Sequence, residues 1–215
     1  MRFAIGFLKQ VWAGLLVLLA LTAVLGCCIR PPCGRGAHRL GVRGGLSGPR
    51  RRGCVVGSRW VGVDPQVPAG EPDPFFHNRV VGSVADEDPF APGDPAAALP
   101  GNQGPSSEVL AGFVEARRAA VAEREGVASH DVPVDAVTGS GSGIDPHISP
   151  AYAQLQVPRV AAVTGLGEDR VRELVAEHTE GRQLGFLGAE RVNVLELNVA
   201  LGLTAPGCNA VPAGE

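Results

Sequence analysis

The sequence predicts a mixed domain of the α+β (or small α/β) class behind one N-terminal transmembrane helix. Helical and strand-like patterns are interleaved from residue 106 onward, apolar residues make up 45% of the 215-residue chain, and residues 10–29 carry no charge. The apolar fraction is sufficient for a packed core, and the length fits one domain with short appendages. With 30 glycines and 18 prolines, the chain is also expected to contain many turns.

The uncharged run 10–29 predicts a membrane anchor. Its 20 residues would form a helix of about 30 Å, which matches the hydrocarbon thickness of a bilayer. A cleaved signal peptide and a lipoprotein signal are the alternatives. Residues 23–27 fit a loose lipobox ending at Cys27, which would tether a lipoprotein or a secreted binding module. The length of the run favours a retained anchor, because the apolar core of a signal peptide is usually shorter.

Charge is distributed unevenly along the chain. Residues 1–60 hold ten basic side chains and no acidic one, whereas residues 61–215 hold nine arginines and all 22 acidic side chains, a net charge of −13. An acidic domain repels phosphates, so nucleic acid is excluded as its partner. Residues 30–56 are rich in Gly and Arg without periodicity and predict a basic linker. By the positive-inside rule alone, the arginines of this linker would hold the domain in the cytoplasm.

The first part of the domain is expected to be rich in loops. Residues 57–105 combine short apolar runs with Pro, Gly and Asp, which predicts loops with one or two short strands. A helix is expected to begin at 106–108, where serine precedes glutamate, and to end at Gly126. Residues 132–138 then predict a strand, and residues 139–143 a glycine-rich loop. We interpret the charged side chains of the helix as a solvated face: Glu108, Glu115, Arg117, Arg118, Glu123, Arg124 and Glu125.

Two more helices are expected in the C-terminal part. Ser149-Pro150 is a favourable helix start, and Pro158 should kink or end that helix. A second helix is expected from Gly167 to Gly181, with one face formed by Val171, Leu174, Val175 and His178. Residues 191–201 fit a strand and also a helix after Asn193, so both alternatives remain open.

Few residues suggest chemistry. The glycine-rich loop lacks the lysine and the following helix of a phosphate-binding loop, and Ser140 and Ser142 do not fit a nucleophile elbow. A metal site could use Asp145, His147, His178 and Glu180, and a membrane-bound hydrolase would use Asp145, His147 and His178. Packing and capping explain these four residues more simply, and the five cysteines have no spacing typical of metal ligands or a disulfide framework. The residues alone therefore indicate no catalytic site and no metal.

A distinctive series of motifs lies in the C-terminal half. Residues 137–150 read VTGSGSGIDPHISP, and QVPRV, HTEGR and RVNVLELN follow at 156–160, 178–182 and 191–198. This series closely resembles the KdpC subunit of the bacterial potassium-transporting P-type ATPase, most strongly over residues 132–201. A weaker likeness continues toward the N-terminus, at 56–62, at FFHNR (75–79) and at GNQGP (101–105).

The resemblance implies a noncatalytic subunit of a four-part potassium uptake complex. Its partners would be an ATP-hydrolysing P-type subunit, a K⁺-channel-like subunit and a small membrane subunit. KdpC-type subunits are described as assembly factors and as catalytic chaperones that raise the ATP affinity of the ATPase subunit. We expect ATP to act through the complex, and we rank assembly above direct contact of this chain with the nucleotide. The implied topology places residues 1–9 in the cytoplasm and residues 57–215 in an extracytoplasmic domain.

The family motifs also supply candidates for structural roles or subunit contacts: Ser140, Ser142, Asp145, His147, Gln156, Arg159, His178, Glu180, Arg182, Asn193 and Asn198. We expect Asp145 to accept backbone N–H groups and to fix the loop that enters the helix at Ser149-Pro150. A charged acceptor of this kind is costly to lose.

The segment after the apolar run departs from the family. Residues 26–34 read GCCIRPPCG, where the family continues with a Val/Leu-Tyr-Pro-x-Ala-Val segment. Codons for GCCIRPPCG, read one nucleotide early, permit Val/Leu-Leu-Tyr-Pro followed by Ala or Pro. We therefore suspect a frame error that is reversed before Val55. Such an error would account for the cysteine cluster, the arginine run and the accidental lipobox.

Overall fold

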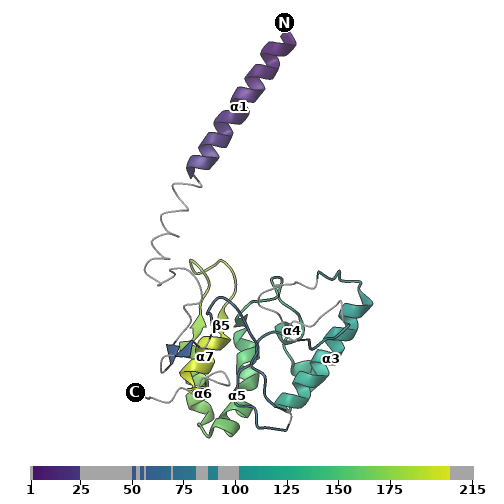
Figure 1. The fold of residues 1–215 in the computed structure, drawn as a ribbon, viewed down its shortest axis with the longest axis vertical. Coiled ribbons are helices and arrows are strands. Elements are labelled where there is room, and N and C mark those ends of the chain that lie inside the picture. Colours follow the sequence, from purple (N-terminus) through teal and green to yellow (C-terminus); the bar gives the residue numbers. More distant parts are fainter. Residues whose placement is uncertain are drawn as a thin grey trace. The chain divides into compact units, whose positions relative to one another are not determined.

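The computed structural model describes residues 2–24, 50–51, 54–55, 57–68, 70–80, 87–91 and 102–203 (Figure 1). The chain divides into two compact units, Met1–Ser47 and Gly48–Glu215. The first unit contains helix α1 (Arg2–Val24), in which Gly6–Val24 is long and apolar enough to cross a bilayer. The N-terminal end of the predicted span thus lies inside a longer helix, while residues 25–29 lie outside the described part of the chain.

Most of the predicted basic linker also lies outside the described residues, as do Cys27, the lipobox and the suspected frame error around it. At the end of the linker, β1 (Arg50–Arg51) and β2 (Cys54–Val55) pair as an antiparallel ribbon. The one or two strands predicted within 57–105 do not form in the described parts of that range. Ser58 and Val61 pair there only as an isolated bridge.

Helix α3 (Glu108–Glu125) has the predicted ends. Ser107 caps its N-terminus, because the Ser107 hydroxyl accepts the Leu110 N–H at 3.2 Å, and Gly126 ends it. The prediction that its charged residues form a solvated face is wrong in part. Arg117 is 2% exposed and the Glu125 side chain is fully buried. The α3 helix therefore directs charge into the domain.

The strand predicted over 132–138 is wrong. After a short 3₁₀ turn (Ser129–Asp131), these residues form the helical turn α4 (Val134–Val137). Both the backbone N–H and the hydroxyl of Thr138 donate to the Val134 carbonyl, at 3.1 and 2.9 Å. The adjacent residues Ala136 and Val137 are both buried, which an alternating strand does not allow.

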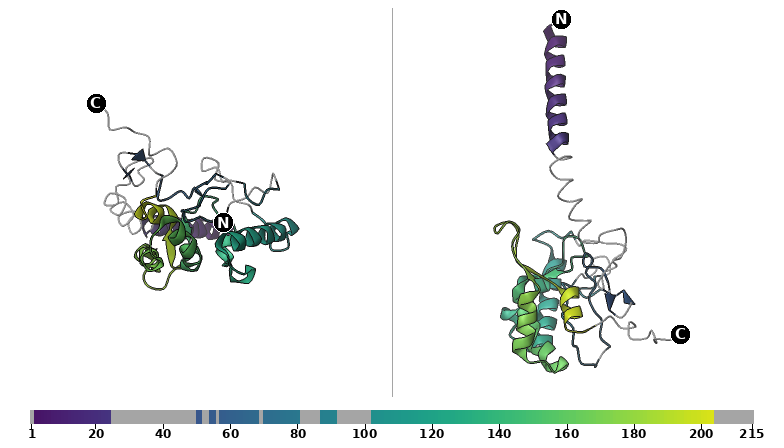
Figure 2. Two further views of the ribbon diagram at one scale, coloured as in Figure 1. Left: turned by 90° about the horizontal axis from the view of Figure 1, so that it is seen from below. Right: turned by 90° about the vertical axis from the view of Figure 1, so that its left-hand side faces the viewer.

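Helix α5 (Pro150–Thr164) begins as predicted, with Ser149 as its cap, but it runs through Pro158 instead of ending there. Proline cannot donate to the carbonyl four residues earlier, which belongs to Gln154. Gln154 and Pro158 are both exposed, so water can satisfy that carbonyl. The α5 helix packs against α3 and against α6 (Glu168–Glu177), as the two views of Figure 2 illustrate.

The predicted mixture of helices and short strands is confirmed. Strands β3 (His147–Ile148), β5 (Arg191–Asn193) and β4 (Thr179–Glu180) form an antiparallel sheet in the order β3-β5-β4. The segment 191–201 combines its two alternatives, because α7 (Val194–Ala200) follows β5 directly. Helix α6 buries Val171, Leu174 and Val175 as predicted, but it ends at Glu177, before Gly181.

The apolar core lies where α5 meets α4, α6, α7 and the sheet. Its largest fully buried side chains include Tyr152, Phe76, Leu197, Val137, Val157, Val160, Val171, Val175, Val192 and Val194. Phe76 is the member that comes from the loop-rich part of the chain. The segment around Phe76 is therefore anchored inside the domain although it forms no strand.

Candidate functional site

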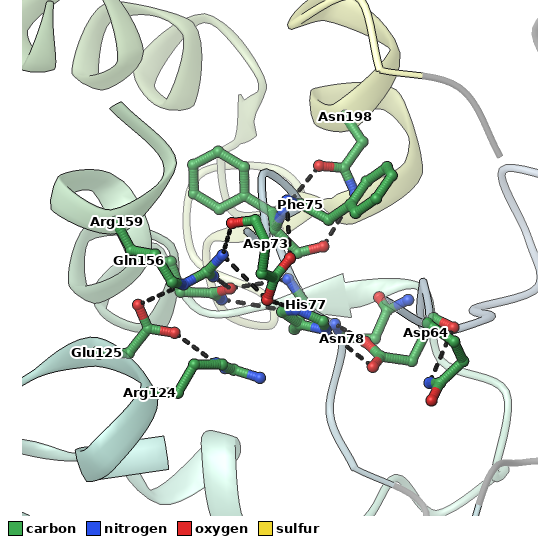
Figure 3. A network of polar contacts seen from close by, with 12 residues as sticks. Asp64, Asp73, Phe75, His77, Asn78, Arg124, Glu125, Gln156, Arg159 and Asn198 are labelled. Carbon is green, nitrogen blue, oxygen red and sulfur yellow. Dashed lines mark hydrogen bonds and ion pairs between the residues drawn. The ribbon is translucent and has the colours of Figure 1, made fainter. Parts of the chain in front are cut away.

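Residues 73–79, which we call the clamped segment, are held by side chains from two helices (Figure 3). Gln156 of α5 accepts the His77 N–H at 2.8 Å and donates to the His77 carbonyl at 3.3 Å. Asn198 of α7 does the same for Phe76, at 2.8 and 2.9 Å. Two side-chain amides thus replace the neighbouring strand that this backbone lacks.

The ring of His77 lies between two carboxylates. Its Nδ1 is 2.9 Å from Asp64 and its Nε2 is 2.6 Å from Asp73. Burial disfavours the charged ring, yet the hydrogen bonds to both carboxylates raise the pKa of His77 above its ordinary value. Because a ring nitrogen facing a carboxylate must donate, the doubly protonated cation is the form that this geometry stabilises.

Arg159 connects the clamped segment to α3. Its guanidinium donates to the Asp73 carbonyl at 2.7 Å and lies 3.2 Å from the Asp73 carboxylate. Its Nε donates to the buried Glu125 at 3.0 Å. Burial raises the pKa of Asp73, but His77 and then Arg159 outweigh burial and lower it below its ordinary value.

The other side of Glu125 faces Arg124, at 2.7 Å. Arg124 also donates to the hydroxyl of the core residue Tyr152 at 2.9 Å. Burial opposes the charge of Arg124, but Tyr152 and Glu125 raise its pKa. An acid buried between two arginines is paired on both sides, which is the condition for keeping a carboxylate charged inside a protein.

The glycine-rich loop is attached to the clamped segment by Arg79. The Arg79 guanidinium donates to the carbonyls of Thr138 and Gly139, at 3.0 and 2.7 Å, and lies 3.9 Å from Asp145. Gly62 approaches the same loop closely, with its N–H 2.7 Å from the Ile144 carbonyl. A Cβ atom on Gly62 would lie 2.4 Å from the Asp145 carbonyl oxygen, so a side chain does not fit there.

Asp145 and His147 meet, as their spacing allows. One Asp145 carboxylate oxygen is 3.0 Å from both the backbone N–H and the ring Nδ1 of His147, and these bonds lower the pKa of Asp145. As expected, Asp145 accepts a backbone N–H in the loop that enters α5. At the helix start itself, Asp135 holds Ser149, at 2.7 Å to its N–H and 2.9 Å to its hydroxyl.

The remaining candidates have local roles. Asn193 caps α7 through the Glu196 N–H at 3.1 Å and donates to the Arg59 carbonyl at 2.9 Å. The carboxylate of Glu180 lies 2.6 Å from the Arg191 guanidinium and 3.4 Å from the Arg59 guanidinium.

His178 directly follows α6, and its ring Nδ1 lies 2.9 Å from the Leu174 carbonyl of that helix. The hydroxyl oxygens of Ser140 and Ser142 lie 3.4 Å apart, and the Ser142 hydroxyl accepts the Ile144 N–H at 3.2 Å. Arg182 is exposed.

The arrangement has a structural character throughout. Within the described ranges, no three His, Cys, Asp or Glu side chains form a cluster suited to a metal ion. His147 and His178 are also engaged with different partners, Asp145 and Leu174. The polar network fixes loops by pairing Asp73, His77, Glu125 and Arg159 with other protein groups.

Sequence reasoning missed Asp64, Asp73, His77, Glu125 and Asp135. For His77 a signal existed, because it lies in the FFHNR motif. For Asp64 and Asp73 no local signal distinguishes them from other loop acids, because their partners lie elsewhere in the chain. Asp135 was missed because residues 132–138 were predicted to form a strand. The buried position of Glu125 was missed because Glu125 was assigned to a solvated helix face.

Comparison with known proteins gives a consistent result. A family model described as "KdpC: K+-transporting ATPase, c chain" matches residues 11–202. A potassium-transporting ATPase KdpC subunit from Kineococcus radiotolerans is 46% identical over 202 residues, which cover 93% of this chain and 96% of that protein. The protein of the same name from Streptomyces coelicolor is 41% identical over 210 residues, covering 91% and 93%.

Proposed function

Because the chain belongs to the KdpC family, the c chain of K⁺-transporting ATPases, we propose that it is a noncatalytic subunit of an ATP-driven potassium uptake complex. Its partners are the ATP-hydrolysing P-type subunit, the channel-like subunit that conducts K⁺ and a small membrane subunit. The match over residues 11–202 carries this proposal. The polar network supports the noncatalytic part, since its charged groups are occupied in holding loops.

The role of this subunit is to assemble and stabilise the complex. It raises the affinity of the ATPase subunit for ATP through contacts between subunits, without binding nucleotide itself. The net charge of −13 on residues 61–215 supports an indirect role, because an acidic domain repels phosphates.

The topology we propose has the N-terminus in the cytoplasm, helix α1 in the membrane and the domain outside. The net charge of −13 on residues 61–215 supports this placement, because an acidic domain near a K⁺ entrance raises the local cation concentration. A green fluorescent protein fused after Glu215 should stay dark, and alkaline phosphatase fused there should be active. A bright fluorescent fusion would show that the domain lies in the cytoplasm and would contradict the proposed topology.

The function is tested by affinity purification of the tagged full-length chain from membranes of cells grown at low K⁺. We expect an ATPase subunit and a channel-like subunit to co-purify, with K⁺-stimulated ATPase activity in the complex and none in the chain alone. A complex prepared without this chain should have a lower yield and a higher KM for ATP. Failure of any ATPase subunit to co-purify, or ATP hydrolysis by the chain alone, would refute the proposal.

A further inference from the structure

The connection between β4 and β5 contains a turn with outward-facing apolar side chains. Two backbone bonds of 2.9 Å between Gln183 and Leu187 close this turn, and a third joins Gly185 to the Arg182 carbonyl at 3.1 Å. We call residues 183–187 the apolar turn. Leu184 is 82% exposed, Phe186 68% and Leu187 48%. The three side chains are therefore presented to the surroundings in one fixed backbone conformation.

This presentation costs free energy. Leu184 has a φ of 53° and Gly185 a φ of 82°, and a bulky side chain is rarely found in the left-handed region. Asn or Gly would fit the Leu184 position with less strain and without exposing an apolar side chain. A fixed turn also loses little conformational entropy when it binds, which favours a contact surface.

The base of the apolar turn continues into an aromatic and arginine-rich surface. Glu180 of β4 pairs with both Arg191 and Arg59. The Arg59 guanidinium lies over the ring of Trp60, 5.2 Å from its centroid, and Trp60 is itself exposed. Trp, Phe and Arg are enriched in protein interfaces, and Trp and Arg are among the residues that contribute most of the binding free energy.

Charge favours a protein over the bilayer as the partner. Residues 61–215 carry a net charge of −13, which an anionic membrane surface repels. Arg182, at the start of the turn, forms no ion pair among the described residues of the domain. A partner that offers an apolar pocket with a carboxylate beside it would match both features.

We propose that the apolar turn, with Trp60 at its base, is the anchor by which this domain docks into an apolar pocket of a partner subunit, where Arg182 meets an acidic group. The proposal rests on the proposed function, since it assigns the contact surface of that assembly. Leu184 and Phe186 fill the pocket. The ion pairs of Glu180 with Arg59 and Arg191 keep the apolar turn in position.

Photo-crosslinking in the full-length chain, in native membranes, tests the proposal. p-Benzoylphenylalanine replaces Phe186 in one variant and Val134 in the control, because Val134 is 70% exposed on α4. We expect an adduct with another subunit, identified by mass spectrometry, from position 186 but not from position 134. An adduct with lipid only, no adduct, or equal adducts at both positions would overturn the proposal.

The double variant Leu184→Asn/Phe186→Ser provides a second test. Asn tolerates the φ of residue 184, so the chain should keep its unfolding temperature while at least tenfold less partner co-purifies. Val134→Ser is the matched control, and it should change neither quantity. Normal co-purification with the double variant would overturn the docking proposal alone. Absence of co-purification with the wild-type chain would refute the proposed function, and the docking proposal with it.

Discussion

Asp135 holds Ser149 with both carboxylate oxygens, at 2.7 Å to the backbone N–H and 2.9 Å to the hydroxyl. The same hydroxyl accepts the Tyr152 N–H at 3.0 Å, so Asp135 orients the cap of α5 from another helical turn, α4. The helix that carries Gln156 and Arg159 is thus positioned by a residue 14 positions earlier in the chain.

Asp135→Ala should destabilise the domain by about 1–3 kcal/mol, because two donors on Ser149 lose their acceptor. For a chain of this size, that loss corresponds to a fall in unfolding temperature of roughly 2–4 °C per kcal/mol. Thermal unfolding of the purified full-length chain measures it. Glu115→Ala, at an exposed position of α3, is the control and should stay within about 0.5 kcal/mol.

Asp145→Ala should lower stability and the yield of assembled complex together, because the variant leaves the His147 N–H without its acceptor. K⁺-stimulated ATPase activity per assembled complex should stay unchanged. A variant that assembles normally but turns over poorly would give Asp145 a direct mechanistic role and contradict the structural interpretation.

The position of His77 between the carboxylates of Asp64 and Asp73 predicts a pH dependence of stability. The pKa of His77 is raised in the folded chain, so its stabilising contribution is complete below the ordinary value of 6.5 and is lost as pH rises through the raised pKa. The pKa of Asp73 is lowered, so its contribution is present above 3.8 and is lost as pH falls through the lowered pKa.

Urea unfolding of the wild type and His77→Gln between pH 6 and pH 9 measures the His77 contribution. The stability difference between the two chains should be largest at pH 6 and should shrink as pH rises. His130→Gln removes a histidine whose side chain is 84% exposed and should leave the profile unchanged. A stability difference that is constant with pH would show that His77 is not charged in the folded chain.

Two glycine substitutions should have opposite signs. Gly62→Ala places a Cβ 2.4 Å from the Asp145 carbonyl oxygen. The three atoms nearest to this Cβ all belong to the backbone, so the clash is relieved only by separating the loops, at a cost of at least about 1–3 kcal/mol. Gly112→Ala lies in α3, where the new Cβ meets nothing within 4 Å, and should stabilise by about 0.5–1 kcal/mol. Equal effects in urea unfolding would contradict the close approach at Gly62.

The suspected frame error also makes a prediction. Resequencing the DNA for residues 26–55 should reveal two compensating shifts, and the corrected frame should remove the cysteines and most of the arginines of this segment. Peptide mass spectrometry of the purified chain is the protein-level check. Peptides that contain the printed residues 30–52 would reject the error and leave the basic linker as part of the protein.

Local signals in the sequence were sufficient where the stabilising contacts are local. The serine caps at Ser107 and Ser149 lie three residues from the N–H groups that they accept, so the starts of α3 and α5 could be predicted. Helix α4 could not be predicted, because Arg117 of α3 and Arg79 of the clamped segment bind the carbonyls at its end.

The polar network escaped prediction for the same reason. Glu125 is bound by Arg159, 34 residues later, and Arg159 reaches the Asp73 carbonyl across 86 positions. Nothing near Glu125 in the sequence distinguishes a buried acid from a solvated one. By contrast, the family motifs identified Gln156, Arg159 and Asn198 as important without stating what they contact.

The two amide clamps impose an order on biosynthesis. Gln156 lies 79 positions after His77, and Asn198 lies 122 positions after Phe76. Contacts over such separations form only after long loops close, which slows folding. During synthesis the segment 73–79 therefore lacks these partners until residues 156 and 198 have been made. A chain that stops before Asn198 would leave the N–H and the carbonyl of buried Phe76 without their partners, so the formation of α7 completes this part of the fold.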